Sequence, residues 1–172
     1  MWQSEYRLHL YPTEISYSFD LKRMEDFLKD EEFINKKLER NRFSTGNTFV
    51  SRLTFMGCSP DIELEPQTDK PFCYIELENH KNAQFISGKN LKRARCPFCK
   101  NDILQPTLCS HCKKPLNPQN INWRKTAFFA SSWITIGNIY ELEAIPNDLF
   151  LDLLEKETNT KWKAAYIRHY NV

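Results

Sequence analysis

The 172-residue sequence predicts an α+β fold in which an antiparallel or mixed sheet carries helices on one face and is interrupted by a cysteine-rich insertion. Three observations support this fold class. Short stretches in which apolar and polar residues alternate indicate strands, and two stretches with apolar residues at every third or fourth position indicate helices. Between them, residues 91–120 contain four of the six cysteines of the chain.

The N-terminal region predicts strands followed by a helix. Residues 6–11 alternate, and the alternation resumes over 15–19, which predicts two strands or one interrupted strand. Apolar residues at helical spacing over 21–40 predict a helix that begins after an N-capping Asp20. An acidic cluster at 30–32 can divide this helix into two pieces.

The middle of the chain predicts two strands and a loop. Residues 48–57 alternate between apolar and polar side chains, and 71–78 are rich in β-forming residues. Residues 79–90 are polar, and we expect them to form a loop. The cysteine-rich segment begins directly after this loop.

The C-terminal region predicts a strand, a helix and a strand. Residues 133–143 predict one long or hairpin-bent strand around Gly137, and a helix begins near Pro146 with four apolar residues on one face. Residues 161–167 are expected to be the last strand. The resulting order of elements suits a ferredoxin-like split βαβ arrangement.

The length and composition suit a discontinuous α+β domain, residues 1–90 and 121–172, with residues 91–120 inserted into it. No apolar run approaches the roughly 20 residues that a bilayer span requires. The first residues do not form a basic stretch followed by an apolar one, so we expect no signal peptide. These observations lead us to expect a cytoplasmic protein that does not contact a membrane.

Cysteine spacing gives the clearest chemical signal in the chain. Cys96 and Cys99 form one CxxC pair, and Cys109 and Cys112 form a second. Two such pairs can supply four thiolates to one tetrahedral Zn²⁺ ion, and a reducing compartment favours metal over disulfides. Four protein ligands leave no open position, so we predict one structural zinc ion rather than a catalytic one. Iron or an iron–sulfur cluster can use the same four sulfurs and remains the alternative.

The two cysteine pairs resemble the knuckles of a zinc ribbon over residues 94–116. The resemblance implies a small module that the metal holds together, and it extends to no other part of the chain. Many knuckles carry a glycine after the second cysteine, whereas Lys100 and Lys113 occupy these positions here. A positive φ at either lysine would therefore carry some strain.

The charge of this segment suggests a binding role. Residues 89–125 hold nine basic residues and one acidic residue, a net charge of +8, whereas the rest of the chain holds 15 basic and 21 acidic residues, a net charge of −6. A basic surface on which Phe98 or Trp123 can stack would suit nucleic acid, but no nucleic-acid motif is present. The cations concerned are Lys92, Arg93, Arg95, Lys100, Lys113, Lys114, Arg124 and Lys125.

We therefore predict a non-enzymatic zinc protein whose basic ribbon recognises a macromolecule or mediates self-association, with a protein partner favoured over nucleic acid. In one alternative the ribbon docks on acidic residues of its own domain, namely Asp61, Glu63 and Glu65. In another, the chain is a structural subunit of a larger complex.

The remaining cysteines offer a catalytic alternative. Cys58 lies in a Gly-Cys-Ser-Pro corner at a strand end, where a thiol can act as a nucleophile, so a small enzyme with structural zinc is the competing reading. No histidine stands at a diagnostic spacing from it. Cys73 is expected to be buried in a strand. A second metal site formed by Cys58, Cys73 and His80 is disfavoured.

Overall fold

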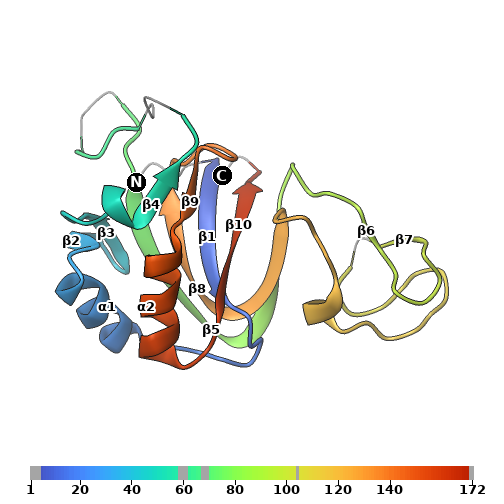
Figure 1. Cartoon of the computed structure of the whole chain (residues 1–172). Helices are drawn as coiled ribbons and strands as arrows, with labels where there is room; N and C mark the ends of the chain where they lie inside the picture. The colour runs from blue at the N-terminus through green and yellow to red at the C-terminus, as the bar shows by residue number, and fades with distance from the viewer. Residues whose placement is uncertain (1–4, 58–61, 67–69, 104, 171–172) are drawn as a thin grey trace.

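The main sheet is fully antiparallel and has six strands in the order β10-β1-β8-β5-β3-β2 (Figure 1). The computed structural model describes residues 5–57, 62–66, 70–103 and 105–170. The six strands are β1 (Tyr6–Pro12), β2 (Ile34–Glu39), β3 (Arg42–Thr45), β5 (Tyr74–Ser87), β8 (Ala127–Gly137) and β10 (Trp162–Arg168). The helices are α1 (Leu21–Asp30) and α2 (Asp148–Thr158).

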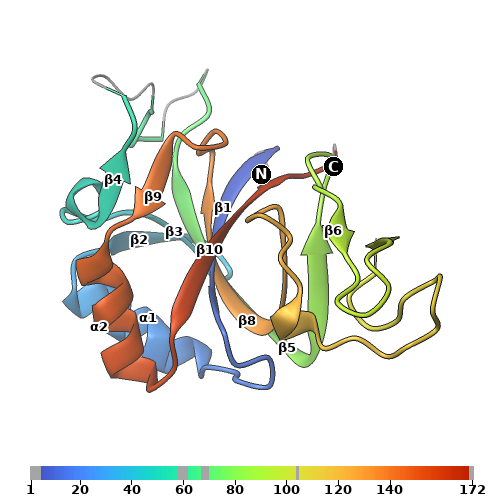
Figure 2. The same ribbon diagram turned by 45° about the vertical axis from the view of Figure 1, so that its right-hand side comes forward.

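The topology confirms the predicted α+β class and its split βαβ arrangement. Strand β8 lies between β1 and β5, and the connection from β1 to β5 contains α1 and the β2–β3 hairpin. Strand β1 lies between β8 and β10, and the connection from β8 to β10 contains α2. The β2–β3 hairpin extends this four-stranded unit at the β5 side. Both helices cover the same face of the sheet, as Figures 1 and 2 show.

The shorter elements lie at the ends of the sheet and in the cysteine-rich region. A two-stranded piece pairs β4 with β9, and a second pairs β6 with β7. These elements are η1 (Val50–Arg52), β4 (Leu53–Phe55), β6 (Ala94–Arg95), β7 (Asp102–Ile103), η2 (Pro118–Asn120) and β9 (Ala144–Pro146). No helix of the described residues has the length and apolar character that crossing a bilayer requires.

Side-chain caps fix where both helices begin. The Asp20 carboxylate accepts a hydrogen bond from the Arg23 backbone N–H at 2.8 Å, and the Asn147 side chain accepts one from Phe150 at 2.9 Å. These caps satisfy N–H groups that have no partner inside the helix. The predicted N-cap at Asp20 is confirmed.

The predicted helix over 21–40 is wrong beyond Asp30. The chain reverses through Glu32, which has a positive φ of 55°, and continues as β2 and β3. Ile34 and Leu38 are four residues apart, and this spacing places two side chains on the same face of a strand as well as of a helix. The apolar period alone could not distinguish the two.

Three further expectations change in the structure. Residues 15–19 form no strand, and only Leu53–Phe55 of the predicted strand 48–57 is extended. The polar stretch 79–90 is not a loop, because β5 continues to Ser87 and pairs with β8 across a register shift between Asn79 and Gln84. Residues 139–143 are a loop rather than a strand.

The apolar core of the body fills the space between the sheet and its two helices. Phe150 of α2 is fully buried and packs against Phe33 with ring centroids 4.4 Å apart. Leu8 and Leu10 of β1 contribute from the sheet, as do Ile134 and Ile136 of β8. Burial of large apolar side chains therefore stabilises this part of the molecule.

The strands β5 and β8 extend beyond the helix-covered body as a curved arm, and residues 88–126 project from its end as a separate lobe (Figures 1 and 2). We call residues 88–126 the cysteine lobe. It contains the predicted insertion, and the expectation that 91–120 folds as its own domain stays a prediction.

Candidate metal centre

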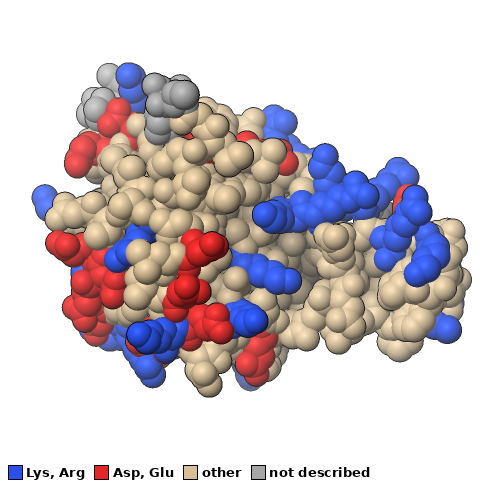
Figure 3. All heavy atoms as spheres, in the orientation of Figure 1, with Lys and Arg blue, Asp and Glu red and all other residues tan. Residues whose placement is uncertain are grey.

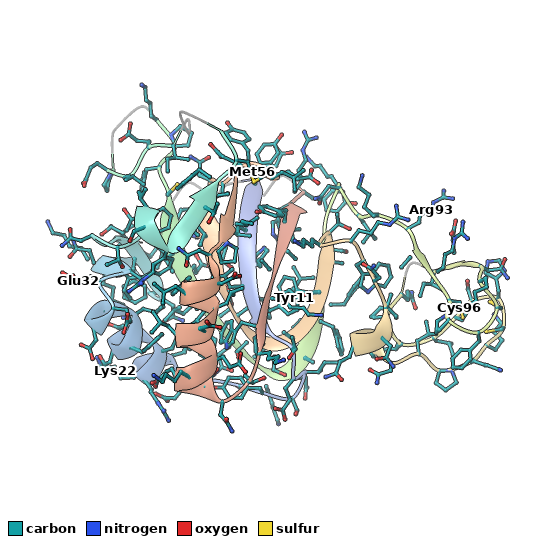
Figure 4. All side chains as sticks on the ribbon, in the orientation of Figure 1. Tyr11, Lys22, Glu32, Met56, Arg93 and Cys96 are labelled. Atoms are coloured by element: carbon teal, nitrogen blue, oxygen red, sulfur yellow. The ribbon has the colours of Figure 1, made fainter. Side chains whose placement is uncertain are left out.

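The four thiols of the two CxxC pairs converge in the cysteine lobe, where Figure 4 labels Cys96. Their sulfur atoms all lie within 4.8 Å of one another. The Sγ atoms of Cys96 and Cys112 are 3.8 Å apart, and those of Cys99 and Cys109 are 3.7 Å apart. In the described part of the chain, no other group of three or more histidine, cysteine or acidic side chains comes together in this way.

These distances distinguish metal ligands from disulfides. A disulfide holds its sulfurs about 2.05 Å apart, so the cysteines are not oxidised pairs. A tetrahedral ion with metal–sulfur bonds of about 2.3 Å separates its ligand sulfurs by about 3.8 Å. The four thiols therefore match the donor set of one tetrahedral metal ion.

Both knuckles use the same backbone pattern. The N–H of Lys100 donates to the Cys96 carbonyl and the N–H of Lys113 donates to the Cys109 carbonyl, each at 3.0 Å. The φ angles of Lys100 and Lys113 are 64° and 60°. The left-handed conformation predicted as a source of strain is present, and it costs roughly 1–2 kcal/mol for a residue with a Cβ.

Hydrogen bonds prepare one thiol for ionisation. The backbone N–H of Asn101 lowers the pKa of the Cys99 thiol to about 6, and the Asn101 side-chain amide lies 3.5 Å from the same sulfur. Asn101 is a supporting residue that sequence reasoning missed. Its sequence signal is an amide side chain two positions after the second cysteine of a pair.

The Cys112 thiol shows why the cluster needs a cation. The backbone N–H of Lys114 lowers its pKa, but burial and the neighbouring thiols of Cys109, Cys99 and Cys96 outweigh this effect and raise it to about 11. Four thiolates without a metal would repel one another at this spacing. Binding of a divalent ion removes the repulsion and releases the remaining protons.

Apart from the thiols, the lobe has little to hold it together. Its buried cluster includes Ile103, Leu116 and Trp123, and two of its seven buried members are the metal-facing Cys96 and Cys109. The described residues of the lobe form no α-helix, and β6 and β7 pair over only two residues each. A core this small gives limited stability without an added crosslink.

Most cations of the lobe are free of ion pairs. Arg93 pairs with Asp102 at 3.2 Å, and Lys114 lies over the Phe98 ring at 4.8 Å from its centroid. Within the described residues, no carboxylate forms an ion pair with Lys92, Arg95, Lys100, Lys113, Arg124 or Lys125. Figure 3 shows basic side chains over the lobe, whereas acidic side chains gather over the helices of the body.

Two expectations about this surface are wrong. Trp123 is only 5% exposed and packs against Phe85 of the arm, so it offers no face for stacking, whereas Phe98 is 55% exposed. The lobe does not dock on the acidic loop that contains Glu63 and Glu65, which lies at the far side of the body in Figures 1 and 2. Asp61, the third residue of that prediction, lies outside the described residues.

The other candidate residues lie away from the thiol cluster. Cys73 is fully buried, as predicted, and burial raises the pKa of its thiol to about 12, so it is a poor nucleophile. His80 lies along β5, about 20 Å of extended chain from Cys73, which is too far for a shared ion. His111 is exposed and takes no part in the thiol cluster. Cys58 lies outside the described residues, so its role stays a prediction.

Comparison with protein-family models, with curated proteins and with solved structures finds no match to this chain.

Proposed function

We propose that the four thiolates of Cys96, Cys99, Cys109 and Cys112 hold one structural zinc ion and that this ion shapes the lobe into a basic recognition element for a partner protein. The sulfur–sulfur distances of 3.7 and 3.8 Å carry the proposal. Zinc favours thiolates in tetrahedral geometry and has no redox chemistry of its own, which suits a structural role.

Four protein ligands close the coordination sphere, so the proposed ion neither binds substrate nor activates water. Its contribution is mechanical. It holds the two knuckles against each other and orients the exposed cations around them. A reducing compartment such as the cytoplasm would keep the four thiols available for the metal. The proposal therefore describes a binding protein rather than an enzyme.

A protein partner is favoured because the lobe has unpaired cations but few exposed aromatic faces. Single-stranded nucleic acid is usually bound by stacking bases on a series of aromatic rings. In the described part of the lobe, Phe98 is the one large exposed aromatic side chain, and Lys114 already lies over its ring. Cations without stacking partners suit carboxylates of an acidic protein surface.

Cobalt substitution tests the ligand set. Titration of metal-free protein with Co²⁺ is expected to give the intense visible absorption of a tetrahedral thiolate site, which saturates at one equivalent and disappears when Zn²⁺ is added. Cys112→Ser should weaken or shift these bands, whereas Cys73→Ser, a matched control at a buried thiol outside the cluster, should leave them unchanged. Weak octahedral absorption, or bands that are unchanged in Cys112→Ser or Cys96→Ser, would contradict the proposal.

A salt series tests the partner class. We expect a single-stranded RNA oligonucleotide to bind weakly and to be released by physiological salt, because only phosphate contacts are available. Retention at that salt with submicromolar affinity would shift the proposed partner to nucleic acid. A red, redox-active protein as purified would instead support the iron alternative.

A further inference from the structure

A groove of about 980 Å³ lies between the body and the cysteine lobe, and both line it. Figure 3 shows a hollow at this place. Contacts at two points set the position of the lobe wall. The Gln119 side chain donates to the Thr13 carbonyl at 2.9 Å, and the N–H of Tyr166 in β10 donates to the Lys125 carbonyl at 2.7 Å.

Strand β10 is an edge of the main sheet, and the lobe covers only part of this edge. Even-numbered residues of β10 direct their backbone groups outward. The outward groups of Tyr166 and Arg168 bond to Lys125, Asn90 and Lys89. In the described structure, the outward groups of Trp162 and Ala164 have no such partner, and both residues line the groove.

The other edge of the sheet is guarded more strongly than this one, where Lys163 is the exposed lysine between Trp162 and Ala164. Strand β2 exposes Lys36 and Lys37 and pairs with β3 through register shifts, which are two features that discourage pairing with another chain. At the open part of β10, Trp162 is buried and Ala164 has a small side chain. An incoming strand can therefore approach the backbone closely.

A strained turn places two cations beside this open edge. The N–H of Thr126 donates to the Trp123 carbonyl at 3.1 Å, and the two residues between them, Arg124 and Lys125, have φ angles of 52° and 61°. This is the conformation of a type I′ turn, which favours Asn-Gly. Both side chains are exposed and line the groove. Neither residue is the Asn or Gly that this turn favours, so the turn presents two cations to the groove at a cost in backbone strain.

The charges of the groove differ from wall to wall. Arg124 and Lys125 belong to the lobe wall, and Lys163 of β10 adds a third cation. The two carboxylates of the lining, Glu14 in the segment after β1 and Asp148 at the start of α2, belong to the body. An occupant with acidic residues toward the lobe and neutral residues toward α2 would complement both walls.

We infer that an extended, acidic segment of a partner protein adds a strand to β10 in this groove. Its backbone would pair with Trp162 and Ala164, and its carboxylates would meet Arg124 and Lys125. The inference rests on the proposed function, because the lobe that supplies the cations is the one that the zinc ion is proposed to shape. It adds to that function the place of binding and the chemistry of the partner.

The test uses the full-length protein after its zinc content has been measured as one equivalent. The probes are two fluorescent nonapeptides of alternating valine and threonine. One carries two aspartates at its N-terminus and the other carries two at its C-terminus, and the affinity of each is measured by fluorescence anisotropy. Matched peptides replace the aspartates with lysines, or carry N-methyl groups on alternate amides. We expect an aspartate peptide to bind, the lysine peptide to bind at least tenfold more weakly, and N-methylation to abolish binding.

Two variants assign the binding to the groove. Ala164→Pro removes an outward N–H that bonds to no described residue and should lower the affinity at least tenfold, whereas Ala164→Ser keeps that N–H and should bind normally. The double variant Arg124→Asn with Lys125→Gly keeps the turn, and should weaken aspartate peptides about tenfold without lowering thermal stability.

Zinc-loaded protein that binds neither aspartate peptide would overturn the inference and leave the metal proposal intact. Binding that survives N-methylation or Ala164→Pro would also overturn it. A single-stranded oligonucleotide that binds wild-type protein but not Ala164→Pro would assign the groove to nucleic acid instead. Protein that takes up no zinc in the cobalt and zinc titrations would contradict the proposed function itself.

Discussion

The body and the cysteine lobe achieve order by different means. The body buries a cluster of 21 residues between its sheet and two helices, as counted over the described residues, and helix caps complete it. The apolar cluster of the lobe has seven buried members, of which one is Ala127 of β8 and two are cysteines of the thiol cluster. Apolar burial dominates in the body, whereas crosslinking by a metal would dominate in the lobe.

The difference also concerns backbone strain. The sequence contains no glycine between residues 89 and 126, so the left-handed positions of the lobe fall to Lys100, Lys113, Arg124 and Lys125. A lobe built in this way gives up stability and gains surface charge. Metal binding can compensate, because structural zinc contributes about 10–16 kcal/mol in small zinc-binding peptides. The lobe therefore suits a charged binding surface, and the body suits a stable support for it.

Metal removal should produce the largest effect and the clearest separation of the two regions. Chelation, or Cys109→Ser, is expected to unfold the lobe while the body stays folded, because the two regions have separate buried clusters. Two-dimensional NMR measures this directly. Amide signals from 94–116 should collapse to random-coil positions, and signals of Ile75 and Ile136 should remain. Loss of both sets together would show that the comparison is wrong.

A core substitution in the body should destabilise the body and leave the metal centre of the lobe intact. Phe150→Ala removes a fully buried ring that packs against Phe33, and should lower the free energy of unfolding by about 3–5 kcal/mol. Leu149→Ala at the neighbouring exposed position is the matched control and should change it by about 0.5 kcal/mol or less. Urea unfolding checks both. The zinc content of folded Phe150→Ala should stay at one equivalent, and a large loss of zinc would refute the independence of the two regions.

The joint between the regions should be sensitive at Gly88. A Cβ at this position would lie 2.2 Å from the Arg168 carbonyl oxygen, so Gly88→Ala must displace the lobe from the end of β10. We expect a loss of about 1–3 kcal/mol in thermal unfolding. Gly57→Ala provides the control, because a Cβ there has no neighbour within 4 Å. Equal thermal stability of the two variants would contradict the close contact between Gly88 and the end of β10.

The smallest effect concerns strain in a knuckle. Lys113→Gly relieves a φ of 60° and should increase zinc affinity about two- to fivefold, since the relieved strain slightly exceeds the entropy cost of glycine. Lys92→Gly, at a position without positive φ, carries only the entropy cost of glycine and should not bind zinc more tightly. Competition with a chromophoric chelator measures both values. A loss of affinity in Lys113→Gly would show that the lysine side chain itself supports the site.

The fold class and the thiol cluster could be predicted because their signals are local. Asp20 caps α1 through the N–H of Arg23, three residues further on, and the ligands from Cys96 to Cys112 span 17 residues. The β2 strand could not be predicted, because the spacing of Ile34 and Leu38 suits a helix and a strand equally. The groove was also beyond prediction. It joins Thr13, Lys125 and Tyr166, which only the sheet topology brings together.

Elemental analysis of protein purified without added metal tests the central claim most directly. The account predicts one equivalent of zinc per chain, reduced to a small fraction in a variant that replaces Cys96 and Cys109 with serine. A wild-type protein with well below one equivalent of any transition metal and four freely titrating thiols would contradict it.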